Sequence, residues 1–354
     1  SSHTIFEDIF INHTGTDGIE LLSPATNNSF ENIYLPNVGN GDGIRLINQP
    51  LYSSLRNIYI QGANNDGIEI SNNASYSLFE NITIHNVRLR GIYCEDGSGL
   101  GCSNSIFRTI EIINTTSDDA LYIQDAPNLF VEDIYVENIG GDSSGDYVLY
   151  TSEARNSTFR NIVGVNVGDG IFIDDNSYGS LFENILLDGI TNGSYAYRID
   201  AQSHNATLKN ISIYNITRNP SNTGYGVGMY ISNSDFVSID EIYINGTDND
   251  GLILISSFNS TLENIYLSDI AYTSPSGVPA SSQGLFLASN SHNSFINNVF
   301  IDGVGDIGIY IDAQNVTLNN IDVSNTNDDL LFTSDYDPGF ELVNFTGRNS
   351  LSEG

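Results

Sequence analysis

Positively charged side chains are scarce in this chain of 354 residues. There are 11 Lys and Arg against 44 Asp and Glu, which gives a formal net charge of −33. A field of that sign repels nucleic acid and anionic membrane surfaces, while it favours solubility and cation binding. We therefore expect no nucleic-acid partner. The chain also holds too many Ile, Phe and Tyr residues to be a disordered acidic polypeptide.

Long apolar runs are missing as well. No segment approaches the roughly 18 apolar residues that a membrane-spanning helix needs, so we expect no membrane insertion. Because the chain opens at Ser1 without a methionine, a signal peptide is expected to be either removed or absent. No segment carries a helical apolar pattern long enough to connect parallel strands.

The chain has only two cysteines. Cys94 and Cys102 lie eight residues apart in a Gly-rich segment that can fold back on itself. This spacing favours a local disulfide over two free thiols.

A six-residue phrase, Phe-Glu-Asn-Ile-Tyr-Leu at residues 30–35, recurs along the whole chain and is called the marker below. Its fourteen copies begin at residues 6, 30, 55, 79, 107, 131, 159, 182, 208, 239, 262, 296, 318 and 340. Spacings of 22 to 34 residues are typical of repeat architectures. The sequence therefore predicts a single repeat domain over residues 1–354, with no internal boundary.

Each marker predicts a strand that begins at a sharp corner. Its fourth and sixth positions are almost always Ile, Leu or Val and its fifth varies, which is the alternation of a strand with one buried face. Asn tolerates left-handed backbone, so the third position is suited to a corner. For two of these asparagines, Asn81 and Asn210, we expect the amides to be buried. The asparagines are Asn32, Asn57, Asn81, Asn161, Asn184, Asn210, Asn264, Asn298 and Asn320.

A second motif, Asp-Gly-Ile-x-Ile, follows each marker by about ten residues, for example at Asp17, Asp42 and Asp66. Asp-Gly supplies a turn and Ile-x-Ile a strand. A short Ser-rich piece is expected to form a third strand before the next marker. Equivalent strands from successive coils would pair in parallel. The prediction is an all-β parallel β-helix of about fourteen coils, with three short strands per coil.

The asparagine corner and the Ile-x-Ile strands resemble the right-handed parallel β-helix of the pectate-lyase-like superfamily. The resemblance covers essentially the whole chain, and it implies a fold rather than one function. Of the motifs found in that family's galacturonan hydrolases, Asp118-Asp119 resembles the aspartate pair and Arg198-Ile199-Asp200 faintly resembles another. The remaining motifs are missing. We therefore interpret Asp118 and Asp119 as turn residues and predict no catalytic residue.

Acidic side chains of successive coils are expected to align. Calcium could bridge Asp17, Asp42 and Asp66, or each aspartate could close its own turn without a metal. The sequence requires no cofactor, and Ca²⁺ is the cation that these aspartates could bind. Arg45 falls between Glu20 and Glu69 at one outward position, either as a cross-strand charge ladder or as part of a site.

Large apolar residues occupy the outward position of the Asp-Gly strands after the third coil. These either stack on one another or contact a protein or a sugar chain. The predicted contact residues are Tyr93, Tyr122, Phe172, Tyr230, Phe286 and Tyr310, with Leu149 and Leu331 in the same file. A second aromatic file is predicted on the marker strands, at Phe10, Tyr34, Tyr59, Tyr135, Tyr243, Tyr266 and Phe300.

Fourteen Asn-x-Ser/Thr sequons indicate an extracellular glycoprotein. Asn81 and Asn210 are discounted because they lie within the marker. The candidate glycosylation sites are Asn12, Asn27, Asn73, Asn114, Asn156, Asn192, Asn205, Asn215, Asn245, Asn259, Asn315 and Asn344.

These patterns favour an extracellular or cell-surface structural β-helix protein. Such a protein would assemble head to tail through its open end coils into a filament or surface layer. The alternatives are a protein that binds or cleaves polysaccharides on its Asp-Gly face, and the shaft of a viral spike.

Overall fold

The computed structural model describes residues 3–22, 26–47, 51–71, 74–95, 101–140, 145–191, 195–217, 226–270, 282–334 and 339–350. Contacts divide the chain into two compact units, Ser1–Leu181 and Phe182–Gly354, called unit 1 and unit 2. The expectation of one domain without a boundary stays a prediction. Within the described ranges, no helix is long and apolar enough to cross a membrane.

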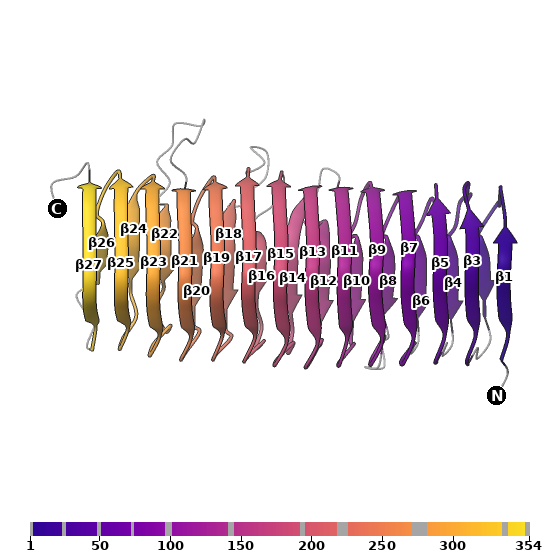
Figure 1. Cartoon of the computed structure of the whole chain (residues 1–354), viewed down its shortest axis with the longest axis horizontal. Coiled ribbons are helices and arrows are strands. Elements are labelled where there is room, and N and C mark those ends of the chain that lie inside the picture. The colour runs from indigo at the N-terminus through magenta and orange to yellow at the C-terminus, as the bar shows by residue number, and fades with distance from the viewer. Residues whose placement is uncertain are drawn as a thin grey trace. The chain divides into compact units, whose positions relative to one another are not determined.

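Unit 1 consists of two parallel sheets, whose strands alternate along the chain (Figure 1). Sheet A contains the marker strands β1 (Ile5–Phe10), β3 (Ser29–Leu35), β5 (Ser54–Gln61), β7 (Leu78–Val87), β9 (Ile106–Thr115), β11 (Phe130–Ile139) and β13 (Thr158–Val167). Sheet B contains the Asp-Gly strands β2 (Ile19–Leu21), β4 (Ile44–Ile47), β6 (Ile68–Ser71), β8 (Ile92–Glu95), β10 (Leu121–Gln124), β12 (Tyr147–Ser152) and β14 (Asp169–Asp174).

Unit 2 repeats this arrangement. Its sheet A strands are β15 (Leu181–Ile190), which begins at the boundary, β17 (Thr207–Ile216), β19 (Ser238–Thr247), β21 (Thr261–Ile270), β23 (Phe295–Val304), β25 (Thr317–Thr326) and β27 (Glu341–Ser350). Its sheet B strands are β16 (Tyr195–Ile199), β18 (Val227–Ser232), β20 (Leu252–Ile255), β22 (Gln283–Leu287), β24 (Ile307–Ile311) and β26 (Leu331–Thr333). Each predicted marker is thus a sheet A strand, and the predicted parallel β-helix is confirmed.

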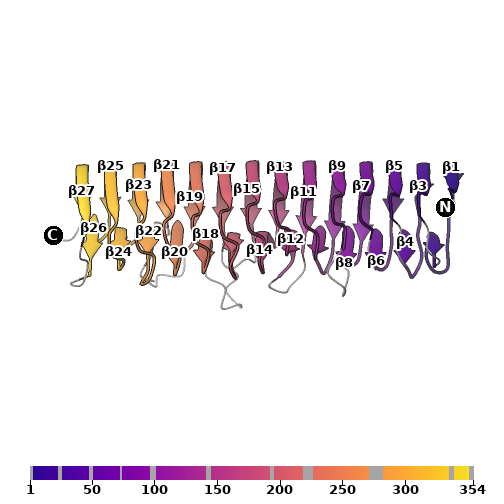
Figure 2. The ribbon, with the colours of Figure 1, turned by 90° about the horizontal axis from the view of Figure 1, so that it is seen from below.

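The strands of sheets A and B lie in two layers (Figure 2). The buried apolar side chains of these strands form the core between the layers. In β3, Ile33 and Leu35 are 1% and 0% exposed, while Tyr34 between them is 42% exposed. The apolar residue before the corner, Phe30, is also buried. The corner makes this possible, because strict alternation would turn Phe30 to the other face.

The asparagine corner is a ladder on the outside of the coil. All nine predicted asparagines have a left-handed backbone, with φ between 51 and 56°. Asn57 Nδ2 donates to Asn32 Oδ1 at 2.9 Å, and Asn81 Nδ2 donates to Asn57 Oδ1 at 2.8 Å. The amides of Asn81 and Asn210 are exposed rather than buried, because each side chain reaches along the surface to the neighbouring coil.

A second corner follows the first by five residues and was missed in the sequence. Asn86, Asn114 and Asn138 have φ between 54 and 60°. Asn114 donates to Asn86 at 2.9 Å and Asn138 to Asn114 at 3.1 Å. The signal in the sequence was an Asn, Asp or Gly that recurs five residues after the first corner.

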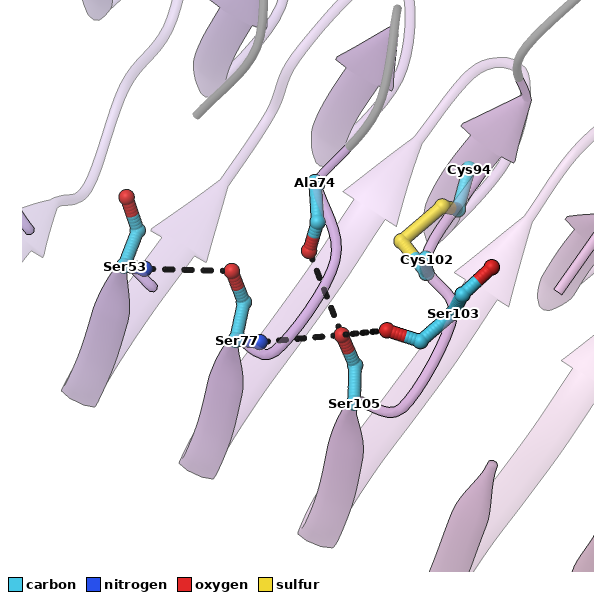
Figure 3. Close-up of a disulfide and its surroundings, with 7 residues drawn as sticks. All are labelled: Ser53, Ala74, Ser77, Cys94, Cys102, Ser103 and Ser105. Carbon is cyan, nitrogen blue, oxygen red and sulfur yellow. Dashed lines mark hydrogen bonds between the residues drawn. A yellow bond between two sulfur atoms is a disulfide. The ribbon is translucent and has the colours of Figure 1, made fainter. Parts of the chain in front are cut away.

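Among the residues that the structure describes, the Ser-rich third side forms no separate sheet. Its last residues are the start of the next sheet A strand, and buried serines replace strand pairing before that point. Ser53 N donates to Ser77 Oγ at 3.1 Å, and Ser77 N donates to Ser105 Oγ at 3.0 Å (Figure 3). A hydroxyl from each following coil thus accepts a backbone N–H that would otherwise lack a partner.

The disulfide joins Cys94, in β8, to Cys102 beside this serine ladder (Figure 3). Both cysteines are buried. The bond ties the end of β8 to the third side of the coil.

A row of aspartates ties the turns before sheet B. Asp42 Oδ1 accepts the backbone N–H of Asp66 at 3.0 Å, and Asp66 Oδ1 accepts that of Arg90 at 2.9 Å. In unit 2, Asp250 Oδ1 accepts the N–H of Gln283 at 2.7 Å. These aspartates are buried, so their main contact is with the next coil rather than with water.

Replacing one asparagine of the corner tests the ladder. Asn57→Ala loses two hydrogen bonds, each contributing about 0.5–1.5 kcal/mol. Alanine also lacks the polar side chain that lets Asn adopt left-handed backbone, which costs other residues roughly 1–2 kcal/mol. Asn57→Asp still accepts from Asn81 but cannot donate to Asn32. Urea unfolding should rank stability as wild type, then Asp, then Ala. An alanine variant as stable as the wild type would contradict the role of the ladder.

Stability should also depend on the protonation of Asp250. Burial raises the pKa of Asp250 to about 6, so the folded protein holds this proton more tightly than the unfolded chain. The contribution is present at low pH and is lost as the pH rises through 6. From pH 4.5 to 7.5, Asp250→Asn should gain about 2 kcal/mol of stability relative to the wild type, measured by denaturation at each pH. Glu341→Gln, at an exposed position, is the control and should show the same pH dependence of stability as the wild type. If Asp250→Asn also showed the wild-type pH dependence, the account would be wrong.

Candidate functional site

The outward positions of sheet B form one continuous row in unit 1. In β4 to β10 the first and third residues are buried and the second faces outward. Because the strands pair in register, these second residues lie side by side. The row runs through Glu20, Arg45, Glu69, Tyr93, Tyr122, Tyr150 and Phe172.

The predicted outward residue was wrong by one position in two strands, β12 and β26. Leu149 pairs with Leu121 and faces inward, so Tyr150 takes the outward place. Leu331 pairs with Ile309, so Phe332 is the outward residue there. A slip of one residue exchanges the two faces of a strand. Thr151 concealed the register of β12, because this polar residue fills the inward position that Ile123 fills in β10.

The aromatic rings of this row contact one another. The ring centroids of Tyr93 and Tyr122 are 5.3 Å apart, and those of Tyr122 and Tyr150 are 4.7 Å apart and stacked. Burial, followed by the charge of Asp174, raises the pKa of Tyr150, whose hydroxyl donates to Asp174 at 3.3 Å. Burial also raises the pKa of Tyr122, whose hydroxyl donates to Gln124 at 3.0 Å, so Tyr122 and Tyr150 are un-ionised at neutral pH.

Phe172 ends the row as a buried residue. It is 8% exposed, with Tyr147 at 5.4 Å between ring centroids and Tyr150 edge-on. The prediction that Phe172 is a contact residue is therefore wrong. Its ring supports Tyr150 from the side.

Arg90 lies against the tyrosines. Its guanidinium carbon is 4.3 Å from the ring centroid of Tyr93 and 4.9 Å from that of Tyr122. Asp118 accepts a hydrogen bond from Nη2 at 2.9 Å, which fixes the guanidinium over the rings. The Arg90 backbone is held in turn by Asp66.

The two aspartates compared above with a catalytic pair have separate structural roles. Asp118 is half-buried and binds Arg90. Asp119 is buried and accepts the backbone N–H of Tyr147 at 2.6 Å, and burial raises its pKa. Asp119 is thus a member of the aspartate row, and Asp118 is a positioning residue for Arg90.

An acidic group lies at the other end of the row. Oxygens of Asp42, Asp66 and Glu69 lie within 4.8 Å of one another. Arg45 forms the expected charge ladder, at 2.8 Å from Glu69 and 3.2 Å from Glu20. Burial raises the pKa of Glu69 to about 7, and a hydrogen bond that protonated Glu69 donates to Asp42, together with the charge of Asp42, adds to this shift. Burial also raises the pKa of Asp66 to about 6.

The acidic group fits a calcium ion poorly. Calcium takes six to eight oxygen ligands, while one oxygen of Asp42 and one of Asp66 already accept backbone N–H groups. Arg45 places a positive charge against Glu69 and Asp42. Asp17, predicted as a third metal ligand, is not part of the group and accepts the N–H of Asp42 instead. No chemical step is therefore assigned to a metal.

Unit 2 carries a similar arginine and tyrosine group. Arg198 lies 5.3 Å from the ring centroid of Tyr195 and 5.9 Å from that of Tyr230, and Asp200 binds it at 2.7 Å. The outward row of this unit contains Arg198, Tyr230, Ile253, Phe286, Tyr310 and Phe332. Ile253 is buried, so this row is interrupted as a contact surface.

A shallow cavity of about 450 Å³ adjoins the unit 2 group, lined in part by Asp200, Gln202, Asn233, Asp235 and Phe258. Ser232 and Arg198 hydrogen-bond to Asp200 and lower its pKa against the opposing effect of burial. Asp235 accepts the backbone N–H of Phe258 at 2.8 Å. The polar groups of this cavity are therefore largely engaged within the fold.

The candidate glycosylation sites differ in how their side chains are used. Asn73 and Asn192 lie outside the described residues. In several others the Nδ2 atom, to which a glycan would be attached, donates to another side chain: Asn114, Asn215, Asn245, Asn315 and Asn344. Asn12, Asn156, Asn205 and Asn259 are exposed. Glycosylation stays a prediction.

Comparison with solved structures finds similar chains at low sequence identity. The periplasmic alginate epimerase AlgG is 12% identical, with 92% of this chain and 78% of that chain covered and a TM-score of 0.46. The A-module of the mannuronan C-5 epimerase AlgE6 from Azotobacter vinelandii is 14% identical, with 90% of each chain covered and a TM-score of 0.41. The catalytic domain of a GH87 alpha-1,3-glucanase is 12% identical, with 90% and 64% covered and a TM-score of 0.40.

Comparison with curated protein sequences finds no match. The sequence profile of the right handed beta helix region matches residues 1–153 and 42–200, which together make up more than half of the chain. The chain therefore belongs to the family of proteins with a right-handed β-helix region.

Proposed function

We propose that this protein binds an uncharged polysaccharide along the outward row of sheet B, with Arg90, Tyr93 and Tyr122 as its main contact in unit 1. The observation that carries the proposal is the fixed position of Arg90. Asp118 holds its guanidinium against two tyrosine rings. A guanidinium packed against aromatic rings at a surface offers hydrogen-bond donors beside apolar area. Small-molecule sites combine these two features.

The repetition of the row supports a polymeric ligand. Rings and hydroxyls recur once per coil, at 4.7 to 5.3 Å between the centroids of Tyr93, Tyr122 and Tyr150. Repeat proteins use such extended surfaces to bind extended partners. Tyr122 and Tyr150 stack, and Tyr93 is tilted against Tyr122, so the rings present mainly their edges and hydroxyl oxygens. These oxygens can accept hydrogen bonds from sugar hydroxyls.

The charge around the row favours an uncharged ligand. Asp118, Asp174 and Glu69 lie at or beside the row, in a chain with a net charge of −33. Anionic polysaccharides would be repelled by this field. Uncharged sugars avoid the repulsion and can donate hydroxyl hydrogens to the carboxylates.

We also propose that the protein acts outside the cytosol. The Cys94–Cys102 disulfide supports this location, because such bonds persist in oxidising compartments. Assembly through the end coils stays a prediction, and it is compatible with ligand binding on sheet B.

Arg90→Ala tests the binding site. The variant should bind a panel of glucans, mannan and xylan about tenfold more weakly than the wild type in isothermal titration calorimetry, because the braced guanidinium is lost. Arg348→Ala, which removes an arginine paired with Asp322 on β27, is the matched control and should bind normally. Equal binding by the wild type and Arg90→Ala to every polysaccharide would contradict the proposal, provided that thermal melting shows both folded.

A second function, cleavage of the bound polysaccharide, is favoured by Glu69. This residue stands next to Tyr93 in the outward row, and its pKa of about 7 keeps a large fraction protonated at neutral pH. A carboxylic acid in that state can protonate a glycosidic oxygen as the bond to the sugar carbon breaks. Water then adds to that carbon and gives a proton back to the Glu69 carboxylate.

The cleavage hypothesis predicts a pH dependence. Release of reducing ends should fall as the pH rises above about 7, because the acid form of Glu69 is lost. Glu69→Gln should abolish release while retaining binding. If no reducing ends appear from the panel at pH 5 to 8, the protein binds polysaccharide without cleaving it.

A further inference from the structure

The outward row of sheet A is interrupted in the middle of unit 1. The row runs through Phe10, Tyr34, Tyr59, Thr83, Glu111 and Tyr135. Phe10 stacks on Tyr34 at 5.5 Å, and Tyr34 stacks on Tyr59 at 4.7 Å. The small side chain of Thr83 follows, so the face of Tyr59 that points towards Thr83 is not covered by another ring of this row.

The asparagine ladder breaks at the same coil. Asn32, Asn57 and Asn81 are linked, but the next corner is Thr109. Threonine has no amide to donate to Asn81 Oδ1, so the carbonyl at the end of this ladder remains an available acceptor. Thr109 has a φ of 55°. A β-branched residue rarely adopts left-handed backbone, and such strain concentrates at functional sites.

Polar groups surround the open face of Tyr59. A groove of about 390 Å³ runs beside Tyr34 and Tyr59, with Asn57, Asn81 and Thr83 in its lining. His85 meets Tyr59 edge-on, at 5.7 Å between ring centroids. His85 Nε2 lies 2.8 Å from Glu111 Oε1, which anchors the carboxylate beyond Thr83. The groove beside Tyr59 thus contains a hydroxyl and an amide carbonyl. The Glu111 carboxylate lies one coil beyond Thr83.

We propose that this notch, formed by Tyr59, Asn81, Thr83, His85 and Glu111, is a second binding site for one unit of an uncharged glycan. A sugar ring has an apolar face of C–H groups and an edge of hydroxyls. The apolar face packs on Tyr59, while hydroxyls bond to Asn81 Oδ1, Thr83 Oγ1 and Glu111. The notch lies on sheet A, so it is independent of the proposed sheet B site.

The spacing of the row argues against a cationic ligand. Tyr135 is three coils from Tyr59, or about 14 Å at the usual strand spacing of about 4.8 Å. The two tyrosines therefore cannot close around one ammonium group, and Glu111 is already paired with His85. The same distance leaves the notch open along the row. The rest of a longer glycan can therefore extend from the bound unit in that direction.

Filling the notch tests the proposal without removing any support of the fold. Thr83→Tyr extends the stack of Phe10, Tyr34 and Tyr59 over the open face and keeps a residue with high strand propensity. Thr83→Ser is the matched control, because it keeps the small side chain and the hydroxyl. The probes are the tetrasaccharides cellotetraose, laminaritetraose, maltotetraose, mannotetraose and xylotetraose.

The readout is saturation-transfer difference NMR of each probe, with calorimetry for those that bind, in an Arg90→Ala background that lacks the sheet B contact. Thr83→Tyr should weaken the residual binding at least about tenfold, and Thr83→Ser should leave it within about twofold. Equal binding by all three proteins, or no residual binding in the Arg90→Ala background, overturns the notch. Failure of the sheet B site appears separately, as wild-type binding unchanged by Arg90→Ala alone.

Discussion

Every coil of this protein must satisfy the backbone polar groups of the next one, and the rest of the structure depends on that constraint. Strand pairing does so within sheets A and B. Outside the sheets, serine hydroxyls on the third side and aspartates before sheet B accept backbone N–H groups of a neighbouring coil. The asparagines at the outer corners bond to one another from coil to coil through their side chains. A buried N–H without a partner costs free energy comparable to a lost hydrogen bond. These ladders therefore fix the register of the coils.

A fixed register determines which positions can carry function. Inward positions are filled by stacked apolar side chains, and the corners are held by their hydrogen bonds. The outward positions of the two sheets are the ones left free to vary. In unit 1 the sheet B row changes from charged to aromatic at Tyr93, and the sheet A row changes from aromatic to polar at Thr83. Both proposed sites lie at such changes of chemistry.

The sequence predicted most of the fold, because the marker and the Asp-Gly motif report the two sheets directly. It did not reveal the serine ladder, since a run of serines also suits an exposed strand. It misplaced Leu149, because the polar Thr151 faces the core in that coil. Arg90 was not identified, because its contact with Tyr122 joins residues of neighbouring coils and depends on the register. The raised pKa of Glu69 depends on burial, which the sequence pattern does not report.

The central claim is that sugar binds on the outward row of sheet B. A crystal structure of the protein with an uncharged oligosaccharide that it binds would test this claim most directly. The account predicts sugar density over Tyr93, Tyr122 and Tyr150, with a hydroxyl within hydrogen-bond distance of Arg90. Density confined to any other surface, with these tyrosines in contact with solvent alone, would contradict it.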